Sequence, residues 1–224
     1  MNVQLLTRDE FREGVFLHKY PRTPHLPHSP GSTNDDKIHK NVGFFDNKEV
    51  VVTLKMDGEN TSIYNNYLHA RSLDSTNHPS RNWIKQFASE KIFGHLPGGW
   101  RICGENLFAK HSIHYQDLTS YFYAFSIWSQ NNIALGWDES IEWFELLGLE
   151  YVPVIYRGQY DLDAIIKAFE PYKYNHEGFV VRLSAAIEYD QFNTSFAKYV
   201  RANHVQPNAE HWMYQEIIPN NLMD

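Results

Sequence analysis

The sequence predicts an α+β fold in which antiparallel sheets are flanked by helices. Three observations support this prediction. Residues 62–69 have the pattern of a hairpin with an asparagine turn, and the expected strands do not alternate regularly with helices as they do in a doubly wound parallel sheet. Two helical patterns, near residues 138–147 and 161–169, lie between the later strands and each begins with an aspartate.

The first fifty residues predict a short helix followed by irregular chain. Thr7 and Glu10 have the capping-box spacing, so a helix is expected over about residues 7–14. Residues 20–34 contain four prolines, which exclude regular helix or a central strand and predict an ordered covering loop or a flexible arm. The β-branched run at residues 50–54 predicts a buried strand that ends at Lys55.

The later elements follow from turn signals and apolar spacing. A helix is expected from Ser80, as its N-cap, to about residue 93, with Trp83, Phe87 and Ile84 facing inward. Asp138 and Asp161 are expected to cap the two later helices. The remaining strands are expected at residues 100–104, 121–128, 151–155 and 178–183.

Composition limits the kinds of function. The formal net charge of −7 in 224 residues means that any surface for nucleic acid is local, because proteins held mainly by phosphate contacts usually have a basic excess. Residues 71–85 and 18–28 are the two candidate basic segments, although a solvated face explains either of them alone. Cys103 is the only cysteine, so neither an intrachain disulfide nor a cysteine zinc site is expected.

The sequence also predicts a cytoplasmic protein that does not enter a membrane. No apolar stretch approaches the roughly 20 residues that cross a bilayer. Residues 1–16 lack the basic start and apolar run of a signal peptide.

A series of short motifs carries the chemistry. The first is Lys55-Met56-Asp57-Gly58. Taken alone, this short pattern is typical of an ordinary strand-to-turn junction. Five further motifs follow in order, and their candidate residues are Arg71 in HARS, Glu105 in CGEN, Phe125 in FYAFSIW, Glu177 in EGFVVR and Lys198 in AKYVR.

Together and in this order, the six motifs resemble the covalent nucleotidyltransferase superfamily. The specific resemblance is to ATP-dependent RNA ligases similar to the phage double-strand-sealing RNA ligase and the kinetoplastid editing ligases. It covers about residues 50–201. It implies one nucleotidyltransferase (adenylation) domain over residues 1–224 without a C-terminal OB domain. Within it, residues 1–46 would form the N-terminal helix and proline-rich covering segment, 47–201 the catalytic core and 202–224 a tail.

The resemblance also implies a role for each candidate residue. Lys55 would be the nucleophile that carries AMP, and Glu177 would hold a magnesium ion, since oxygen ligands suit that hard cation. Glu105 would accept hydrogen bonds from the ribose hydroxyls and Phe125 would pack on the adenine, although a surface acid and plain core packing are the alternatives. The residues expected to contact the nucleotide phosphates are Arg71, Lys198, Arg182 and Arg201.

The chemistry sets a condition on Lys55. An ordinary lysine with a pKa near 10.4 is less than about 0.1% neutral at pH 7, so burial or nearby positive charge must remove its proton. Lys198 and a bound divalent cation are the expected sources of that charge. Asp57 and Asn60 are expected first to shape the turn, and binding of metal-coordinated water is the alternative. The histidines, including His111, show no spacing typical of a metal site.

One departure from the family pattern concerns the last motif. Many relatives carry Lys-x-Lys there, whereas this chain has Val200 at the second lysine position. Arg201 follows one residue later and is expected on the opposite face of the strand. The second phosphate contact is therefore unassigned.

The predicted function is an ATP-dependent RNA ligase that uses ATP and Mg²⁺ or Mn²⁺. It would join RNA 5′-phosphate and 3′-hydroxyl ends through a lysyl-AMP intermediate, with an end-healing kinase or phosphatase as a possible partner. Two alternatives stay open. One is nucleotidyl transfer to a different acceptor, as in capping or AMP transfer to protein, and the other is a non-catalytic nucleotide- or RNA-binding module.

Overall fold

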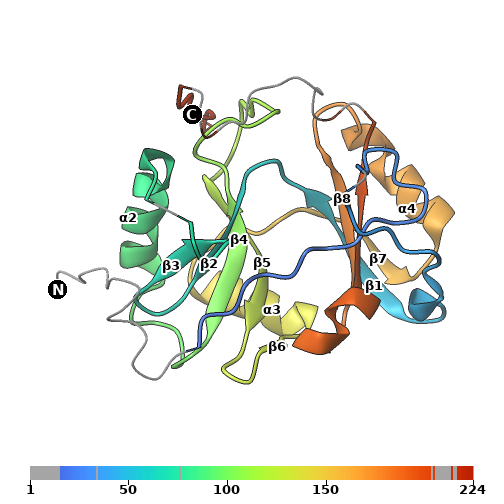
Figure 1. The fold of residues 1–224 in the computed structure, drawn as a ribbon, viewed down its shortest axis with the longest axis horizontal. Coiled ribbons are helices and arrows are strands. Elements are labelled where there is room, and N and C mark those ends of the chain that lie inside the picture. The colour runs from blue at the N-terminus through green and yellow to red at the C-terminus, as the bar shows by residue number, and fades with distance from the viewer. Residues whose placement is uncertain are drawn as a thin grey trace.

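The chain forms two antiparallel sheets that lie side by side, with helices on their outer flanks (Figure 1). This computed structural model describes residues 16–33, 35–75, 77–202, 204, 213 and 216–223. The predicted α+β class is confirmed. The first sheet contains, in spatial order, β10 (Phe196–Val200), β8 (Gly178–Leu183), β1 (Glu49–Lys55) and β7 (Val154–Gln159). The second contains β3 (Leu68–Ala70), β2 (Glu59–Ile63), β4 (Arg101–Asn106), β5 (Phe122–Trp128), β6 (Ile133–Ala134) and β9 (Ile187–Glu188).

Strand β1 is central because its side chains can be buried on both faces. Val50, Val51 and Val52 are fully buried, and the strand pairs with β8 on one side and β7 on the other. β-branched residues pack well on such a pleated surface. The predicted strand ending at Lys55 is therefore confirmed, and it places that lysine at the end of a rigid element.

The predicted hairpin, strand 178–183 and the last helix are also confirmed. Strands β2 and β3 pair with Ile63 opposite Leu68. Helix α4 (Leu162–Phe169) begins after Asp161, whose carboxylate accepts a hydrogen bond from the backbone N–H of Ala164 at 3.1 Å. The other helices are α2 (Asn82–Lys91) and α3 (Trp137–Leu146), and short 3-10 turns occupy Gly43–Phe45, Pro79–Arg81, Glu170–Tyr172 and Tyr189–Thr194.

Two predicted helix caps are wrong. Ser80 lies inside the 3-10 turn before α2 and does not cap the helix. Instead, His78 caps that turn, because its side chain accepts a hydrogen bond from the backbone N–H of Ser80. Asp138 lies within the first turn of α3, and its carboxylate pairs with Arg157 of β7 at 2.5 Å. Both residue types satisfied the local pattern, but tertiary partners decided where each helix begins.

Two other expectations need correction. The strand expected at residues 151–155 begins at Val154, and Tyr151 forms only an isolated bridge with Ala124 of β5. Of the three α2 residues expected to face inward, Ile84 is fully buried, whereas Trp83 and Phe87 are half-buried. The rings of Trp83 and Phe87 stack on each other with their centroids 4.9 Å apart. The two aromatic rings thus cover the edge of the core instead of filling it.

The proline-rich region confirms the ordered alternative. Residues 16–33, called here the N-terminal strap, run from the second sheet to the first and appear in blue in Figure 1. The backbone N–H of Leu26 donates to Lys198 O at 2.8 Å, and Lys198 N–H donates to Pro24 O at 2.8 Å. The strap therefore adds an edge to β10. The helix expected at residues 7–14 lies outside the described residues.

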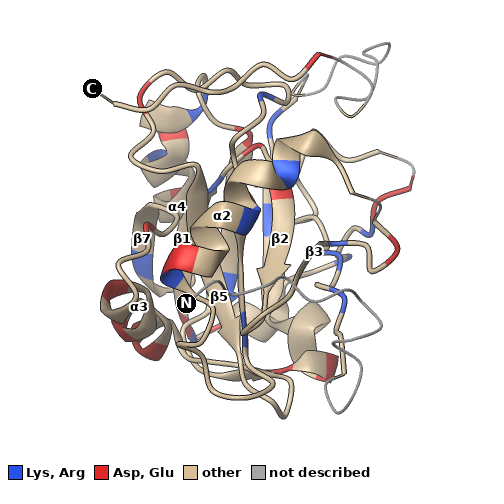
Figure 2. Ribbon diagram, turned by 90° about the vertical axis from the view of Figure 1, so that its left-hand side faces the viewer, with Lys and Arg blue, Asp and Glu red and all other residues tan. Residues whose placement is uncertain are grey.

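The charges are unevenly distributed. Helix α3 is coloured mostly by its acidic residues in Figure 2, and its first turn contains Asp138 and Glu139. The negative net charge is thus partly located on an exposed helix. Within the described part of the chain, no helix combines the length and apolar character that a membrane crossing requires.

Candidate active site

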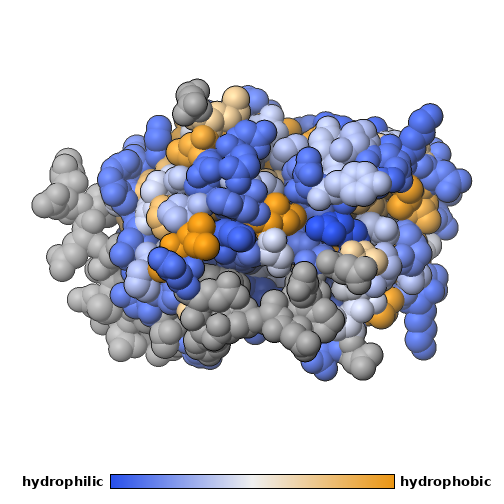
Figure 3. Space-filling view, turned by 90° about the horizontal axis from the view of Figure 1, so that it is seen from above, coloured by the Kyte–Doolittle hydropathy of each residue, from blue (hydrophilic) through white to orange (hydrophobic). Residues whose placement is uncertain are grey.

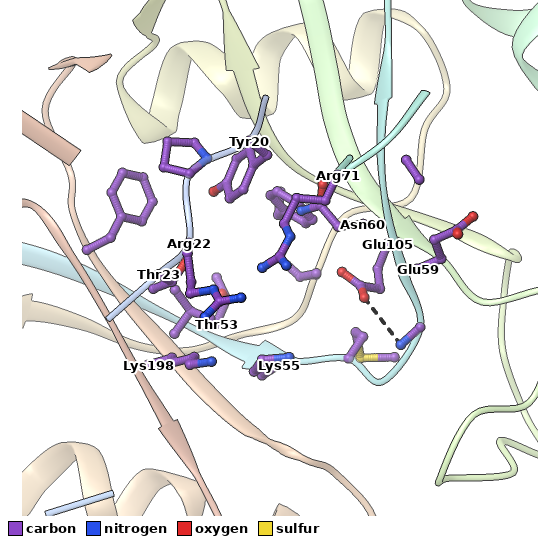
Figure 4. A pocket seen from close by; sticks show the side chains of 18 of the residues that line it. Tyr20, Arg22, Thr23, Thr53, Lys55, Glu59, Asn60, Arg71, Glu105 and Lys198 are labelled. Atoms are coloured by element: carbon purple, nitrogen blue, oxygen red, sulfur yellow. Dashed lines mark hydrogen bonds between the residues drawn. The ribbon is translucent and has the colours of Figure 1, made fainter. Parts of the chain in front are cut away.

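A pocket of about 620 Å³ opens between the two sheets and the strap (Figure 4). Its walls hold six of the eight residues that the sequence motifs single out. Those six are Lys55, Arg71, Glu105, Phe125, Arg182 and Lys198.

The register of the first sheet brings its candidate residues to one face. Lys55 pairs with Gly178, and Lys198 pairs with Val180 two positions along β8. Residues two apart on a strand share a face, so Lys55 and Lys198 point to the same side of the sheet. The residues that line the pocket from this face are Thr53, Lys55, Val180, Arg182, Phe196 and Lys198.

Lys55 forms an ion pair with Glu177. Its Nζ donates to Glu177 Oε2 at 2.5 Å, and the side chains are 24% and 12% exposed. The pairing follows from the register, because Glu177 immediately precedes Gly178. A Cβ atom at Gly178 would overlap the Tyr199 carbonyl oxygen of β10, so only glycine lets the strands approach here.

The charges around Lys55 favour the protonated amine. Burial lowers its pKa, but the carboxylates of Glu177, Glu105 and Asp57 outweigh burial and raise the pKa above the usual lysine value. Burial and Lys198 alone do not offset these carboxylates, so the prediction depends on the divalent cation that was expected as the second source of positive charge. Deprotonation requires a change in the charges around Lys55.

Lys198 has the opposite electrostatic balance. Burial, followed by the positive charge of Lys55, lowers its pKa, while Asp36 opposes that shift. Asp36 lies 3.5 Å from the Lys198 amine and 3.4 Å from His25 Nε2. The segment that follows the strap thus supplies the carboxylate partner of Lys198, which the motifs do not reveal.

Glu105 lies on β4, on the opposite wall, and reaches the turn after Lys55. Its Oε1 accepts the backbone N–H of Gly58 at 3.2 Å, the dashed line in Figure 4. Enclosure in the pocket, together with Glu177 and Asp57, raises the pKa of Glu105 to about 8 against the lowering effect of Lys55. The carboxyl therefore gains or loses its proton close to neutral pH, and in its protonated form it can donate as well as accept a hydrogen bond.

Phe125 enters the pocket because of a β-bulge. Cys103 pairs with Ser126 while Gly104 pairs with Ala124, so Phe125 is the extra residue of β5. Bulges redirect a side chain relative to the strand pattern. The ring of Phe125 contacts the strap residue Tyr20 edge-on, with centroids 5.2 Å apart.

Two predicted phosphate contacts are placed differently from expectation. Arg182 is 2% exposed, and its guanidinium donates to the carbonyls of Leu183 at 3.0 Å and Leu135 at 2.8 Å. Burial lowers the pKa of Arg182 to about 10, so it stays charged. Arg201 donates from Nε to the His176 carbonyl at 3.0 Å and is not among the described residues that line the pocket.

Asp57 and His204 join Glu177 in a group whose geometry suits a metal ion. One donor atom from each of the three lies within 4.8 Å of the others. Asp57 Oδ2 also accepts the backbone N–H groups of Ser112 and Ile113, both at 2.8 Å, so its expected structural role is real. Two carboxylates and an imidazole fit Mn²⁺ and, for the oxygens, Mg²⁺.

Several site residues lie outside the sequence motifs, and three of them bear on the chemistry. Arg22 and Tyr20 come from the strap, and His204 comes from the segment after β10. The basic character of residues 18–28 was the only sequence signal for Arg22. No spacing indicates His204, because it lies more than a hundred residues from Asp57.

The surface seen from above is mostly hydrophilic, and apolar residues form small separate groups on it (Figure 3). Scattered apolar residues of this kind are normal on a soluble surface. The visible part of this face therefore suits a polar ligand better than an apolar one.

The fold of this chain is similar to those of several solved nucleic-acid ligases. An archaeal ATP-dependent RNA ligase, in its form 1, gives a TM-score of 0.56 at 19% identity, covering 83% of this chain and 48% of that chain. A putative ATP-dependent DNA ligase from Aquifex aeolicus gives 0.53 at 18%, covering 83% and 50%. A mutant Naegleria gruberi RNA ligase with ATP and Mn gives 0.50 at 12%, covering 82% and 60%. At such identities the similarity concerns the fold, and this chain spans 48–60% of the length of these chains.

Sequence comparison assigns the family. Among curated proteins, none matches the chain. Residues 48–200, which are more than half of the 224 residues, match the family described as RNA ligase. This range contains every motif from Lys55 to Lys198, and the structure gathers those motifs around one pocket. The chain therefore belongs to the RNA ligase family.

Proposed function

We propose that this chain is an ATP-dependent RNA ligase in which Lys55 becomes covalently attached to AMP. The observation that carries the proposal is the short Lys55–Glu177 pair beside a pocket that also presents Lys198 and Glu105. An amine nucleophile, an adjacent acid and a second cation are the groups that transfer of a nucleotidyl group requires. Residues 47–201 would form the catalytic core.

The two walls suggest how ATP would bind. Phe125 offers a flat apolar face to the adenine, and Glu105 faces the ribose hydroxyls with a carboxyl that can accept and donate hydrogen bonds. Lys198 and Arg71 extend toward the region beside Lys55, where the phosphates would lie. This orientation places the α-phosphate next to the Lys55 amine.

The first chemical step would attach AMP to Lys55. The Nζ atom of Lys55 forms a bond to the α-phosphorus, the bond from that phosphorus to the bridging oxygen breaks, and pyrophosphate leaves. Glu177, which accepts a hydrogen bond from Nζ at 2.5 Å, would take the proton that the ammonium must lose before it attacks. The second proton, lost from the nitrogen as the phosphoramide forms, would pass to water. Lys198 and Arg71 stabilise the negative charge that develops on the phosphoryl oxygens.

A divalent cation, Mg²⁺ or Mn²⁺, is part of the proposal. Glu177, Asp57 and His204 would hold it. When bound, the cation would neutralise phosphate charge and offset the carboxylates that keep Lys55 protonated. Arg182 would support the pocket through its backbone contacts, and Arg201 would not touch the phosphates.

The later steps follow from the family. AMP would pass from Lys55 to a 5′-phosphate end of RNA, and a 3′-hydroxyl would then displace AMP and join the strands. An end-healing kinase or phosphatase would prepare those ends. GTP capping and AMP transfer to protein are the competing acceptor reactions.

Intact-mass measurement tests the proposal. Incubation with ATP and Mg²⁺ or Mn²⁺ should add the mass of one AMP to the wild-type protein and none to Lys55→Ala, while Lys173→Ala, an exposed lysine, should be charged normally. GTP should give no adduct. The proposal is wrong if the wild type stays uncharged or if the Lys55→Ala variant is charged equally. Nicked RNA duplex, single-stranded RNA and DNA then identify what is joined.

A further inference from the structure

Two arginines line the pocket and form no ion pair with a carboxylate among the described residues. Arg22 comes from the strap and Arg71 follows β3, and both line the pocket. In Figure 4 their side chains extend toward the same space, on the side where Lys55 and Lys198 lie. Among the residues that the structure describes, neither guanidinium forms an ion pair, whereas Arg81 on the pocket wall pairs with Glu59 at 2.5 Å.

The two arginines influence each other electrostatically. Burial, and after it the positive charge of Arg22, lower the pKa of Arg71, while the acidic groups of Asp36 and Glu105 only partly oppose that shift. Like charges at such proximity repel each other unless an anion lies between them. A phosphate group is the anion that a guanidinium binds best, because its parallel N–H groups match two phosphate oxygens.

The strap holds Arg22 firmly at this position. Two residues before it, Tyr20 is 6% exposed and packs against Trp128 and Phe192 as well as Phe125. Two residues after it, Pro24 O accepts the backbone N–H of Lys198. The Arg22 side chain uses one donor, Nη1, on the Asp35 carbonyl at 3.0 Å. Its backbone is thus held on both sides, while its side chain lines the pocket.

The same strap covers the position where many relatives carry a second lysine. Val200 is 5% exposed, its N–H donates to Ser29 Oγ at 2.9 Å, and its carbonyl accepts Gly31 N–H at 2.9 Å. A Cβ at Gly31 would lie 2.6 Å from Val200 Cγ1, so the strap leaves no room for a longer side chain there. The segment that excludes a lysine at this position brings an arginine of its own.

We propose that Arg22 replaces the missing second lysine and binds the phosphate chain of the nucleotide together with Arg71 and Lys198. The identity of the nucleotide rests on the proposed function. Arg22 is a binding residue on the strap, and its contribution is to hold the β- and γ-phosphates so that the α-phosphate faces Lys55. Its effect should therefore fall on binding of ATP and pyrophosphate and should spare adenosine.

Equilibrium binding tests this proposal independently of catalysis. Calorimetry would measure the Kd of ATP, inorganic pyrophosphate and adenosine with the full chain. Loss of one charge-assisted contact should weaken ATP and pyrophosphate about 10-fold or more in Arg22→Ala and leave adenosine unchanged. Arg22→Lys should recover part of the loss. Lys19→Ala removes one positive charge from an exposed position on the same strap. This variant should bind ATP, pyrophosphate and adenosine like the wild type.

The outcomes separate this proposal from the proposed function. Unchanged ATP and pyrophosphate binding in Arg22→Ala would overturn it, as would an equal loss in Lys19→Ala, which would reveal a general charge effect. Failure of the wild type to bind either ligand would also overturn it. If the wild type binds ATP but Lys55 is never charged, the ligase proposal fails, while the Arg22→Ala affinities still judge the role of Arg22.

Discussion

The two walls of the pocket differ in how they position their side chains. On the first wall, Lys55 and Lys198 project from neighbouring strands in regular register, and each has a carboxylate partner, Glu177 and Asp36. On the second wall, Phe125 is placed by a bulge, while Glu105 contacts the Gly58 backbone. The charged wall suits phosphate chemistry, and the other wall suits recognition of a nucleoside.

The difference predicts that substitutions on the first wall slow the chemistry and those on the second weaken binding. Regular register fixes positions closely, which a reaction centre requires. A bulge sets the direction of its side chain through the backbone and not through a partner side chain. The residue at the bulge can therefore vary more freely. Four variants test this division, from the largest expected effect to the smallest.

The largest effect is expected from Glu177→Gln. Loss of the carboxylate removes both the partner of Lys55 and a proposed metal ligand, so the rate of AMP attachment should fall about 100- to 1000-fold. Single-turnover intact-mass kinetics would measure it. Glu170→Gln, which alters an exposed pair with Lys173, is the matched control. A Glu177→Gln rate close to that of the wild type would show that Glu177 takes no part in the reaction.

Lys198→Met should lower the same rate by about 100-fold, because one cation at the developing charge is lost while the length of the side chain is kept. The Kd of adenosine should not change, since Lys198 lies on the first wall. Lys167→Met on α4 is a control at a distant lysine. A variant that loses adenosine affinity but retains its rate would contradict the division between the walls.

Phe125→Leu should act on the second wall. Replacing the ring with an aliphatic side chain should raise the KM for ATP about 10-fold and change kcat less than about threefold, because stacking on the base contributes about 1–3 kcal/mol. Phe125→Tyr keeps the ring and should remain near the wild type. Steady-state kinetics with Leu and Tyr variants separates stacking from core packing, since a packing defect would lower the thermal unfolding temperature of Phe125→Leu without raising KM.

Glu105→Gln should change how stability depends on pH. The folded-state pKa of about 8 lies above the usual value of 4.5, so the contribution of the carboxyl is complete below about pH 4.5 and is lost as the pH rises through about 8. The wild type should thus lose about 1 kcal/mol of unfolding free energy relative to the variant over that interval, less than the full shift because the side chain is partly exposed. Urea unfolding at several pH values measures this difference. A constant difference would mean that Glu105 is ionised throughout.

Local patterns predicted the elements that carry the motifs better than those that connect them. The valine run of β1 and the strand after Glu177 occur where expected, because buried β-branched runs leave few alternatives. The helix caps at Ser80 and Asp138 were wrong because each side chain found a different environment in the folded protein. Local preference is decisive only when tertiary contacts do not compete with it.

The candidate site was predicted in part for the same reason. Lys55 and Glu177 stand in short motifs, so the sequence singles out both residues, but the pairing of β1 with β8 is what brings them into contact. Arg22 and His204 belong to segments outside those motifs, and only the path of the chain brings them to the pocket. The protonation of Lys55 depends on the sum of charges around it, which no motif expresses.

The sequence by itself determined the antiparallel α+β class, the lysine at the end of a buried strand and the order of the motifs around it. Hydrophobic runs and glycine turns act over a few residues, so they can be read along the chain. The tertiary structure decided which cations face the pocket, that Phe125 points inward, and that the charges around the Lys55 amine favour its protonated form. Those properties depend on distances between residues far apart in the chain, and such distances exist only once the two sheets and the strap have come together.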